Sequence, residues 1–280
     1  MRGKICIIRK KTGNYKLLAD VSFNTLVNLF IMHKNILVCL ALILTAFLFS
    51  SFLLPLGKPT IWMIGDSTMA IKQPDKFPET GWGVAFAEAF NHQVTVDNRA
   101  RNGRSTKSFI SQGLWDEVAQ GMKEGDYLFI QFGHNDEKIH KPSTGAAIDE
   151  FKKNLAFFVQ QIRRVKGTPV LLSPIARRKF QNGVLVDTHG QYPGAVKQVA
   201  DSLQVTFIDL TSASSQMLAQ AGEESSKAFF LQLAPGEHEN YPEGVIDNTH
   251  LNTHGARAVS DIVTSELKRM NDPLAAFLKN

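Results

Sequence analysis

Short apolar runs alternate with segments of helical periodicity from residue 58 onward, and this alternation constrains the fold more than any other feature of the sequence. Residues 61–64, 126–132 and 169–172 are mostly apolar runs of strand length. Residues 148–165 instead repeat apolar side chains at intervals of three and four, which is typical of a helix that covers a sheet. Strands that alternate with helices form parallel sheets with helices on both faces. The sequence therefore predicts an α/β domain with a central parallel sheet.

The remaining elements are predicted from the same patterns. Further strands are expected at residues 94–96 and 205–210, and further helices at residues 82–90, 105–119, 195–203 and 255–270. Ser105 is the expected N-cap of the helix at 105–119, because a serine hydroxyl can accept a hydrogen bond from a backbone N–H of the first turn. Residues 58–280 contain no internal repeat, and about 220 residues suffice for one well-packed domain.

The first 57 residues carry almost all of the net charge. They hold seven Lys or Arg and one acidic residue, Asp20, a net charge of +6. The other residues hold 24 basic and 25 acidic side chains, a net charge of −1. The net charge of +5 for the whole chain therefore describes the N-terminal segment. It gives no reason to expect that the folded domain binds nucleic acid.

The N-terminal segment also contains an apolar run. Residues 36–56 carry no charge and are preceded by His33-Lys34, which predicts either a signal peptide or a signal anchor. No small-x-small cleavage site precedes Pro59, so the anchor stays open, as does a start at Met32. The alternative is a buried core helix. Either export route places the domain outside the cytoplasm, secreted or periplasmic, with membrane contact only through this apolar segment.

Both cysteines of the chain, Cys6 and Cys39, lie in the N-terminal segment. Residues 58–280 therefore contain neither a disulfide nor a thiol nucleophile. The domain must be stabilised by its hydrophobic core alone.

Four polar segments carry the candidate chemistry. Three of them follow predicted strands, so they are expected at the carboxyl edge of the sheet, where α/β proteins place their ligands. The fourth precedes the last predicted helix. The segments are Gly65-Asp66-Ser67-Thr68, Asn102-Gly103-Arg104-Ser105, Gly133-His134-Asn135-Asp136 and Asp247-Asn248-Thr249-His250.

These segments contain the groups that acyl transfer to a serine requires. A serine hydroxyl becomes a nucleophile when a base takes its proton, and the base needs a partner that fixes its tautomer. Asp247 and His250, three residues apart, can lie on one side of a turn with the ring facing Ser67. The backbone N–H groups of Ser67 and Gly103 and the side-chain amide of Asn135 can form an oxyanion hole.

The four segments resemble, in order, the conserved blocks of the SGNH hydrolases, also called GDSL esterases and lipases. Within that superfamily the chain is similar to the rhamnogalacturonan acetylesterases, which Thr188-His189-Gly190 and residues 240–244 support further. The resemblance implies a flavodoxin-like three-layer sandwich, a Ser/Asp/His triad, and neither a metal nor a cofactor. The disulfides of the fungal members cannot form here.

The resemblance implies an exported serine carbohydrate esterase that removes O-acetyl groups from the pectic polymer rhamnogalacturonan through an acetyl-enzyme on Ser67. The alternatives are an acetylxylan esterase and a broad GDSL lipase or acyl esterase of the same fold. A carbohydrate-binding protein without catalysis is a further alternative, but binding does not need Asp247 and His250 spaced for proton transfer. The expected partner is an acetylated acidic plant polysaccharide.

Several side chains are candidates for binding that polymer. A polygalacturonate-type backbone carries carboxylates, with which arginine pairs bidentately. Basic residues after two predicted strands can supply this contact, although charge clusters are often only solvated surface. Trp82, Trp115 and Tyr241 are candidate platforms for sugar rings, although tryptophan is commonly buried. The predicted substrate-binding residues are Arg101, Arg104, His134, Arg177, Arg178 and Tyr241. For His134 the alternative is a residue that supports the site from behind without touching the substrate.

Each candidate also has a purely structural explanation. Ser67 and Asn135 can cap helices, and Gly103 can serve only a turn. His250 and His254, four residues apart, are also compatible with a zinc pair. However, the residues between them lack the glutamate of the H-E-x-x-H pattern, and no third ligand is evident.

Overall fold

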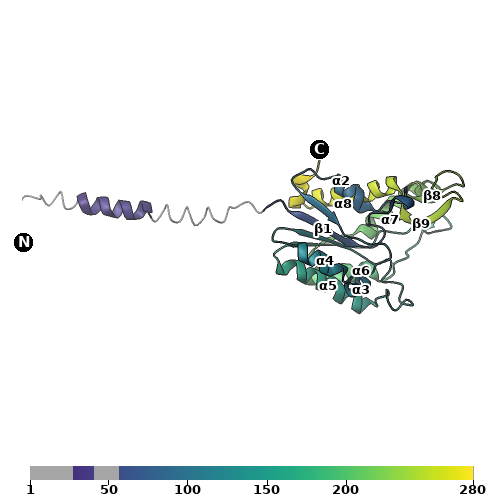
Figure 1. Cartoon of the computed structure of the whole chain (residues 1–280), viewed down its shortest axis with the longest axis horizontal. Coiled ribbons are helices and arrows are strands. Elements are labelled where there is room, and N and C mark those ends of the chain that lie inside the picture. Colours follow the sequence, from purple (N-terminus) through teal and green to yellow (C-terminus); the bar gives the residue numbers. More distant parts are fainter. Residues whose placement is uncertain (1–27, 41–56, 280) are drawn as a thin grey trace, which may run out of the picture. The chain divides into compact units, whose positions relative to one another are not determined.

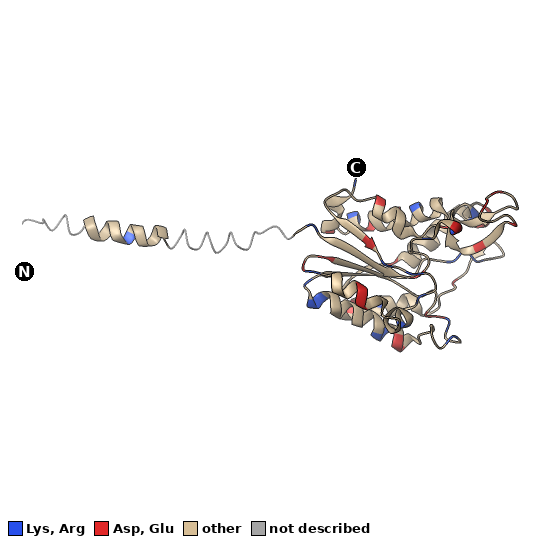
Figure 2. Cartoon of the chain, viewed as in Figure 1, with Lys and Arg blue, Asp and Glu red and all other residues tan. Residues whose placement is uncertain are grey.

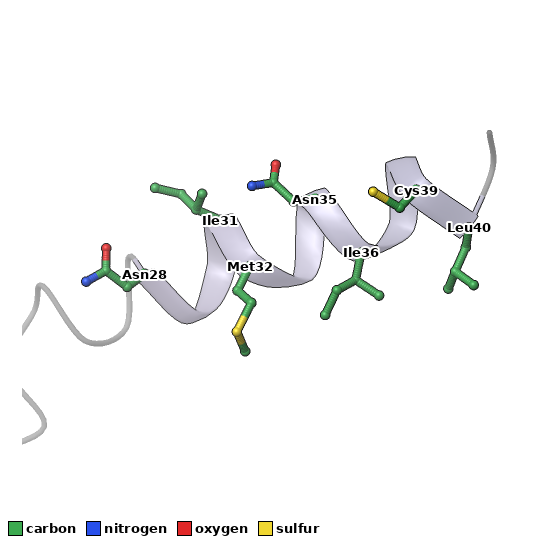
Figure 3. Close-up of a pocket in the computed structure, with 7 residues that line it drawn as sticks. All are labelled: Asn28, Ile31, Met32, Asn35, Ile36, Cys39 and Leu40. Carbon is green, nitrogen blue, oxygen red and sulfur yellow. The ribbon is translucent and has the colours of Figure 1, made fainter. Parts of the chain in front are cut away.

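The computed structural model describes residues 28–40 and 57–279 (Figure 1), and the chain divides into two units, Met1–Pro55 and Leu56–Asn280. In the first unit, residues 28–40 are helical. Figure 3 shows the side chains along this helix that recur at intervals of three and four residues, as on one stripe of a helix. They are Asn28, Ile31, Met32, Asn35, Ile36, Cys39 and Leu40.

Most of the predicted apolar run at 36–56 lies outside the described residues, which include only its first five positions. Among the helices of residues 28–40 and 57–279, none combines the length and the apolar character that a bilayer span requires. The described apolar side chains of this helix are exposed, for example Phe30 at 74% and Leu37 at 67%.

The second unit is built on a five-stranded sheet. Its strands are β1 (Thr60–Gly65), β2 (Thr95–Asn98), β3 (Tyr127–Gln131), β4 (Thr168–Leu172) and β7 (Thr206–Ile208). They are arranged in the order β2-β1-β3-β4-β7, and every neighbouring pair is parallel. The inner strands are apolar on both faces because helices cover both sides of the sheet.

Helices form a layer on each face of the sheet, as Figure 1 shows. One layer contains α2 (Trp82–Glu88), α7 (Leu210–Ser225) and α8 (Thr253–Arg269), and it buries Trp82, Leu210 and Val263. The other contains α3 (Thr106–Ser111), α4 (Leu114–Gly121), α5 (Ile148–Arg164) and α6 (Tyr192–Leu203), and it buries Phe109 and Phe158. The predicted flavodoxin-like three-layer sandwich with a central parallel sheet is confirmed.

Local chemistry explains where the elements differ from the prediction. Ser105 does cap a helix, and its side chain accepts from the backbone N–H of Ser108. The single helix predicted at 105–119 is wrong, because Gly113 adopts φ 74° and separates α3 from α4. Helix α7 and two hairpins were not predicted. The hairpins pair β5 (Phe180–Gln181) with β6 (Val184–Leu185), and β8 (Phe230–Leu233) with β9 (Val245–Leu251).

Short 3₁₀ helices complete the unit: η2 (Pro74–Lys76), η3 (Ser226–Phe229) and η4 (Pro273–Phe277). Figure 2 shows acidic and basic residues interspersed along this unit, in agreement with its near-zero net charge. The strand order reverses at β1, which has β2 on one side and β3 on the other. Open α/β sheets bind ligands in the crevice at such a reversal. The loops that follow β1, β2 and β3 therefore surround the site.

Candidate active site

Ser67 lies two residues beyond the carboxyl end of β1, in a turn that is fixed by the side chain before it. The carboxylate of Asp66 accepts hydrogen bonds from the backbone N–H of Thr68, at 3.0 Å, and from its hydroxyl, at 2.7 Å. The Asp66 carbonyl accepts from the backbone N–H of Met69, which closes the turn. This turn places Ser67 at the sheet edge, where its side chain reaches the β8–β9 hairpin.

Asp247 and His250 lie on β9, in a stretch where that strand bulges out of its ladder. The strands are antiparallel: Phe230 of β8 pairs with Leu251 of β9, and Gln232 pairs with Ile246, so two steps along β8 correspond to five along β9. The extra residues form a turn in which the Asp247 carboxylate accepts from the backbone N–H groups of Thr249, at 2.7 Å, and His250, at 2.9 Å. Because of this bulge, residues three apart face the same side, which a regular strand does not allow.

Ser67, His250 and Asp247 form one hydrogen-bonded line. The Ser67 hydroxyl lies 2.9 Å from His250 Nε2, and His250 Nδ1 lies 2.6 Å from Asp247 Oδ2. Burial favours the neutral acid, but the hydrogen bonds from His250 outweigh it and lower the pKa of Asp247 to about 2. The ionised carboxylate thus holds the Nδ1–H tautomer and leaves Nε2 free to accept the serine proton.

The loops after β2 and β3 carry the other predicted oxyanion donors, Gly103 and Asn135. Gly103 adopts φ 74°, a conformation that glycine reaches without strain. The Asn135 amide donates to the Arg104 carbonyl at 2.9 Å, and its oxygen accepts from Lys138 at 2.8 Å. These contacts fix the amide group and leave its second N–H for a ligand.

His134 forms a second aspartate–histidine pair, with the residue that precedes Ser67 in the chain. Its Nδ1 is 3.2 Å from Asp66 Oδ2, the residue as a whole is 2% exposed, and its Nε2 has no hydrogen-bond partner among the described residues. Burial lowers the pKa of His134 to about 4, so the ring is neutral and donates Nδ1–H to Asp66. The enclosed position argues against direct contact of His134 with a substrate, and the bond to Asp66 agrees with the other role expected for it, a residue that supports the site.

Asp136 is a fully buried carboxyl group that ties the β3 loop to α3. Its Oδ1 accepts from the backbone N–H of Thr106, at 2.9 Å, and from the Thr106 hydroxyl, at 2.5 Å. Burial raises the pKa of Asp136 to about 7 in spite of these two hydrogen bonds. The carboxyl group therefore changes its charge near neutral pH in a place that water does not reach.

The predicted substrate arginines divide into two groups. Arg178 is 8% exposed, and its guanidinium bonds to Ser226, Asn248 and the Glu223 carbonyl. This position contradicts a role in substrate binding, because every guanidinium nitrogen is engaged inside the protein. Arg177 pairs with Glu137 and is mostly buried.

Arg101 and Arg104 flank Gly103. Arg101 is exposed, and Arg104 is partly exposed and donates to the Asn102 carbonyl at 2.9 Å. Of the four predicted arginines, these two have side chains that solvent reaches beside a predicted oxyanion donor.

Of the three aromatic residues predicted to be platforms for sugar rings, the two tryptophans are buried. Trp82 is fully buried and donates to Gln131 at 2.9 Å, and Trp115 is 4% exposed in the opposite core. Neither indole can stack on a sugar. Tyr241 is half-buried, and its hydroxyl donates to the Lys76 carbonyl at 3.0 Å, which links the loop before β9 to η2.

The zinc alternative for His250 and His254 also finds no support in the geometry. His254 stacks on Phe229, with ring centroids 5.0 Å apart, while His250 faces Ser67. Within residues 28–40 and 57–279, no group of three His, Cys, Asp or Glu side chains is arranged to hold a metal ion.

Two residues beside the site escaped the sequence prediction. Lys72 and Glu79 form an ion pair of 2.6 Å, and Glu79 lies 4.0 Å from His250 Nε2. Neither belongs to a periodic pattern or to one of the four polar segments. The only feature of the sequence that pointed to either residue is the position of Lys72 five residues after Ser67. Such proximity does not show that the side chain is buried or that it faces the site.

The chain is similar to several known proteins. The model of the GDSL-like lipase/acylhydrolase family matches residues 63–258. Rhamnogalacturonan acetylesterase RhgT of Bacillus subtilis is 37% identical over 219 residues, 78% of this chain and 93% of RhgT. The probable rhamnogalacturonan acetylesterase YesY of the same organism is 30% identical over 76% of this chain and 94% of YesY. The crystal structure of YxiM, also from Bacillus subtilis, superposes with a TM-score of 0.67 at 24% identity, covering 78% of this chain and 58% of YxiM.

Proposed function

The chain belongs to the GDSL-like lipase/acylhydrolase family and is a serine carboxylic ester hydrolase, and on this premise we propose that it removes O-acetyl groups from rhamnogalacturonan. The observation that carries the substrate class is the 37% identity to RhgT, which extends over 93% of that acetylesterase. The relationship extends over nearly the whole of that acetylesterase and is not limited to one short motif.

The proposed reaction begins with attack of Ser67 Oγ on the acetyl carbonyl carbon. His250 Nε2 takes the hydroxyl proton and then gives it to the departing sugar oxygen, which leaves an acetyl group on Ser67. A water molecule then attacks the acetyl-enzyme, again losing its proton to His250. Acetate leaves, and the proton returns to Ser67 Oγ. Asp247 keeps the ring in the tautomer that both steps require.

Negative charge develops on the acetyl carbonyl oxygen in each step. We assign its stabilisation to the backbone N–H groups of Ser67 and Gly103 and to the Asn135 side chain. Loss of one such donor typically costs about 3 kcal/mol of transition-state stabilisation. The contacts of Asn135 with Arg104 and Lys138 support this role, since they hold the amide in place before substrate arrives.

We propose that Arg101 and Arg104 bind carboxylates of the polysaccharide. Solvent reaches both side chains, and both lie in the segment that carries Gly103, the proposed oxyanion donor, which supports a contact with a uronate next to the acetylated sugar. Exposed charge pairs are screened by salt over a Debye length of about 8 Å at physiological ionic strength. The contribution of these arginines should therefore be visible as a salt dependence that a neutral substrate lacks.

The test compares acetate release from acetylated pectin and acetylated xylan with the hydrolysis of p-nitrophenyl acetate, each at low and high salt. Arg101→Gln should raise KM on acetylated pectin about tenfold, as the loss of a charged hydrogen bond predicts. It should leave p-nitrophenyl acetate hydrolysis unchanged. Arg257→Gln, which alters an exposed arginine on α8, is the matched control. Equal salt profiles on all substrates, with a faster reaction on xylan, would contradict the pectin proposal and favour an acetylxylan esterase.

We also propose that the domain acts outside the cytoplasm. The basic N-terminal segment and the uncharged run at 36–56 support export, either by a cleaved signal peptide or by an anchor. Cell fractionation followed by N-terminal sequencing of the isolated enzyme distinguishes these routes. Enzyme found in the cytoplasm with its N-terminal segment intact would contradict both.

A further inference from the structure

Lys72 is an enclosed cation next to the nucleophile. Its ammonium group contacts three acceptors: the Ser67 carbonyl at 2.5 Å, Asn102 Oδ1 at 2.9 Å and Glu79 Oε1 at 2.6 Å. The side chains of Lys72 and Glu79 are only 5% and 12% exposed. An ammonium group has three N–H donors, so these contacts use all of them. Lys72 is therefore not available to a substrate.

The three contacts join three parts of the site. Ser67 belongs to the turn after β1, Asn102 precedes the predicted oxyanion donor Gly103, and Glu79 precedes α2. Glu79 Oε1 also lies 4.0 Å from His250 Nε2, the nitrogen that faces Ser67. A second carboxylate thus lies beside the catalytic base, on the side opposite Asp247.

An unpaired carboxylate in this place would interfere with the reaction. When His250 carries the serine proton on Nε2, a free Glu79 could accept that N–H and compete with the departing sugar oxygen. It would also favour the protonated ring before substrate binds, and a protonated ring cannot act as base. The ammonium of Lys72 at 2.6 Å offsets the charge of Glu79 and occupies the oxygen nearest to the ring.

We propose that Lys72 and Glu79 are positioning residues that keep His250 neutral and directed at Ser67 and that hold the nucleophile turn and the Gly103 loop together. The inference rests on the proposed roles of Ser67 and His250, and it does not depend on the identity of the polysaccharide.

Other charged and titratable groups contact the imidazole or act on the Lys72–Glu79 pair. Asp247 contacts Nδ1 from β9, and Asp66 and Asp247 both act electrostatically on Lys72. Burial, followed by the charges of Glu79 and Asp247, raises the pKa of Tyr241. Burial lowers the pKa of Lys72, and Glu79 opposes this shift. Of these groups, Lys72 and Glu79 can be substituted without changing the contact of His250 with Asp247.

The test measures kcat and kcat/KM for p-nitrophenyl acetate against pH in the full chain. Lys72→Met leaves Glu79 unpaired, so the acid side of the kcat/KM profile should move upward by about one pH unit. Glu79→Gln leaves Lys72 unpaired and should move it downward. The double variant should return the acid side of the profile to the wild-type position. Its kcat should be about tenfold below that of wild type, because the contacts of Lys72 with Ser67 and Asn102 are lost.

Lys197→Met, which removes an exposed pair with Asp201 on α6, is the matched control and should leave the profile unchanged. A purely structural pair would lower the melting temperature of both single variants without shifting their profiles in opposite directions, and that result would overturn the inference. If Lys72→Met does not fold, Glu79→Gln and the double variant still decide the matter. Full activity of Ser67→Ala would instead refute the proposed function, so the two failures are distinguishable.

Discussion

Two aspartate–histidine pairs adjoin Ser67, one through its hydroxyl and the other through the neighbouring residue Asp66, and they differ in burial and in what surrounds the histidine Nε2. In both pairs an aspartate Oδ2 faces Nδ1, at 2.6 Å in Asp247–His250 and at 3.2 Å in Asp66–His134. The side chains of the first pair are 27% and 30% exposed, whereas those of the second are 0% and 3% exposed. The Nε2 of His250 meets the Ser67 hydroxyl, and that of His134 meets no partner among the described residues.

The comparison shows that an aspartate orients a histidine without making it a base. What distinguishes the two rings is the environment of Nε2. Around His250 this nitrogen has both a hydroxyl to deprotonate and access to substrate. Around His134 burial lowers the pKa to about 4, and the neutral ring serves to support the Asp66 carboxylate that shapes the nucleophile turn.

The largest effect is expected when the Ser67 hydroxyl, which hydrogen-bonds to His250 Nε2, is removed. Ser67→Ala should lower kcat by on the order of 10⁴-fold or more, because no nucleophile remains. The melting temperature should be unchanged, since one hydroxyl in a loop contributes little to stability. Steady-state kinetics and thermal unfolding of the same preparation measure both. A parallel loss of activity and stability would show that Ser67 is a structural cap.

The second prediction compares the same substitution, aspartate to asparagine, in the Asp247–His250 and Asp66–His134 pairs. Asp247→Asn should let the His250 proton move to Nε2, which then cannot accept from Ser67, so kcat should fall by about 10³- to 10⁴-fold with little change in KM. Asp66→Asn should likewise place a proton on Nε2 of His134, where it is buried without a partner. That change should cost about 1–3 kcal/mol of stability and less than tenfold in kcat.

Kinetics and chemical denaturation of the two variants decide whether the pairs differ as stated. If Asp66→Asn lost as much activity as Asp247→Asn while keeping wild-type stability, the buried pair would belong to the catalytic apparatus. If Asp247→Asn were nearly as active as wild type, His250 would have another orienting partner.

The smallest expected effect concerns the stability contributed by Asp136, a carboxyl group that is buried like the Asp66–His134 pair. The pKa of Asp136 is raised from 3.8 to about 7, so the folded protein binds this proton more tightly than the unfolded chain does. The resulting stabilisation is complete below about pH 4 and is lost as pH rises through about 7. Asp136→Asn keeps an acceptor for Thr106 without the charge, so its melting temperature should exceed that of wild type increasingly from pH 5 to pH 8.

Differential scanning calorimetry at both pH values measures this difference, which should amount to several degrees at about 2–4 °C per kcal/mol. Asp149→Asn, at an exposed side chain in the first turn of α5, is the matched control. An equal melting-temperature difference at pH 5 and pH 8 would show that Asp136 does not change its charge in this range.

Local pattern was sufficient to predict most of the sheet and the helices that cover it. Strands 61–64, 126–132 and 169–172 and helix 148–165 were predicted because burial on one or both faces imposes a period that single segments reveal. The break at Gly113 and the helix α7 were missed. A lone glycine does not reveal its φ, and α7 buries only Leu210, Ser214 and Leu218 and so has a weak apolar stripe.

The sequence by itself determined which residue types meet at the site, because four polar segments occur in an order that a family shares. Only the tertiary structure decided how they are used. It revealed the bulge that turns Asp247 and His250 to one side, and it enclosed His134 and Arg178 where exposure had been expected. It also brought Lys72 and Glu79 to the base. The sequence could not reveal these roles because the role of a polar side chain depends on the partner it meets in the fold. Such partners can be far apart in the chain, as Ser67 and His250 are, by 183 residues.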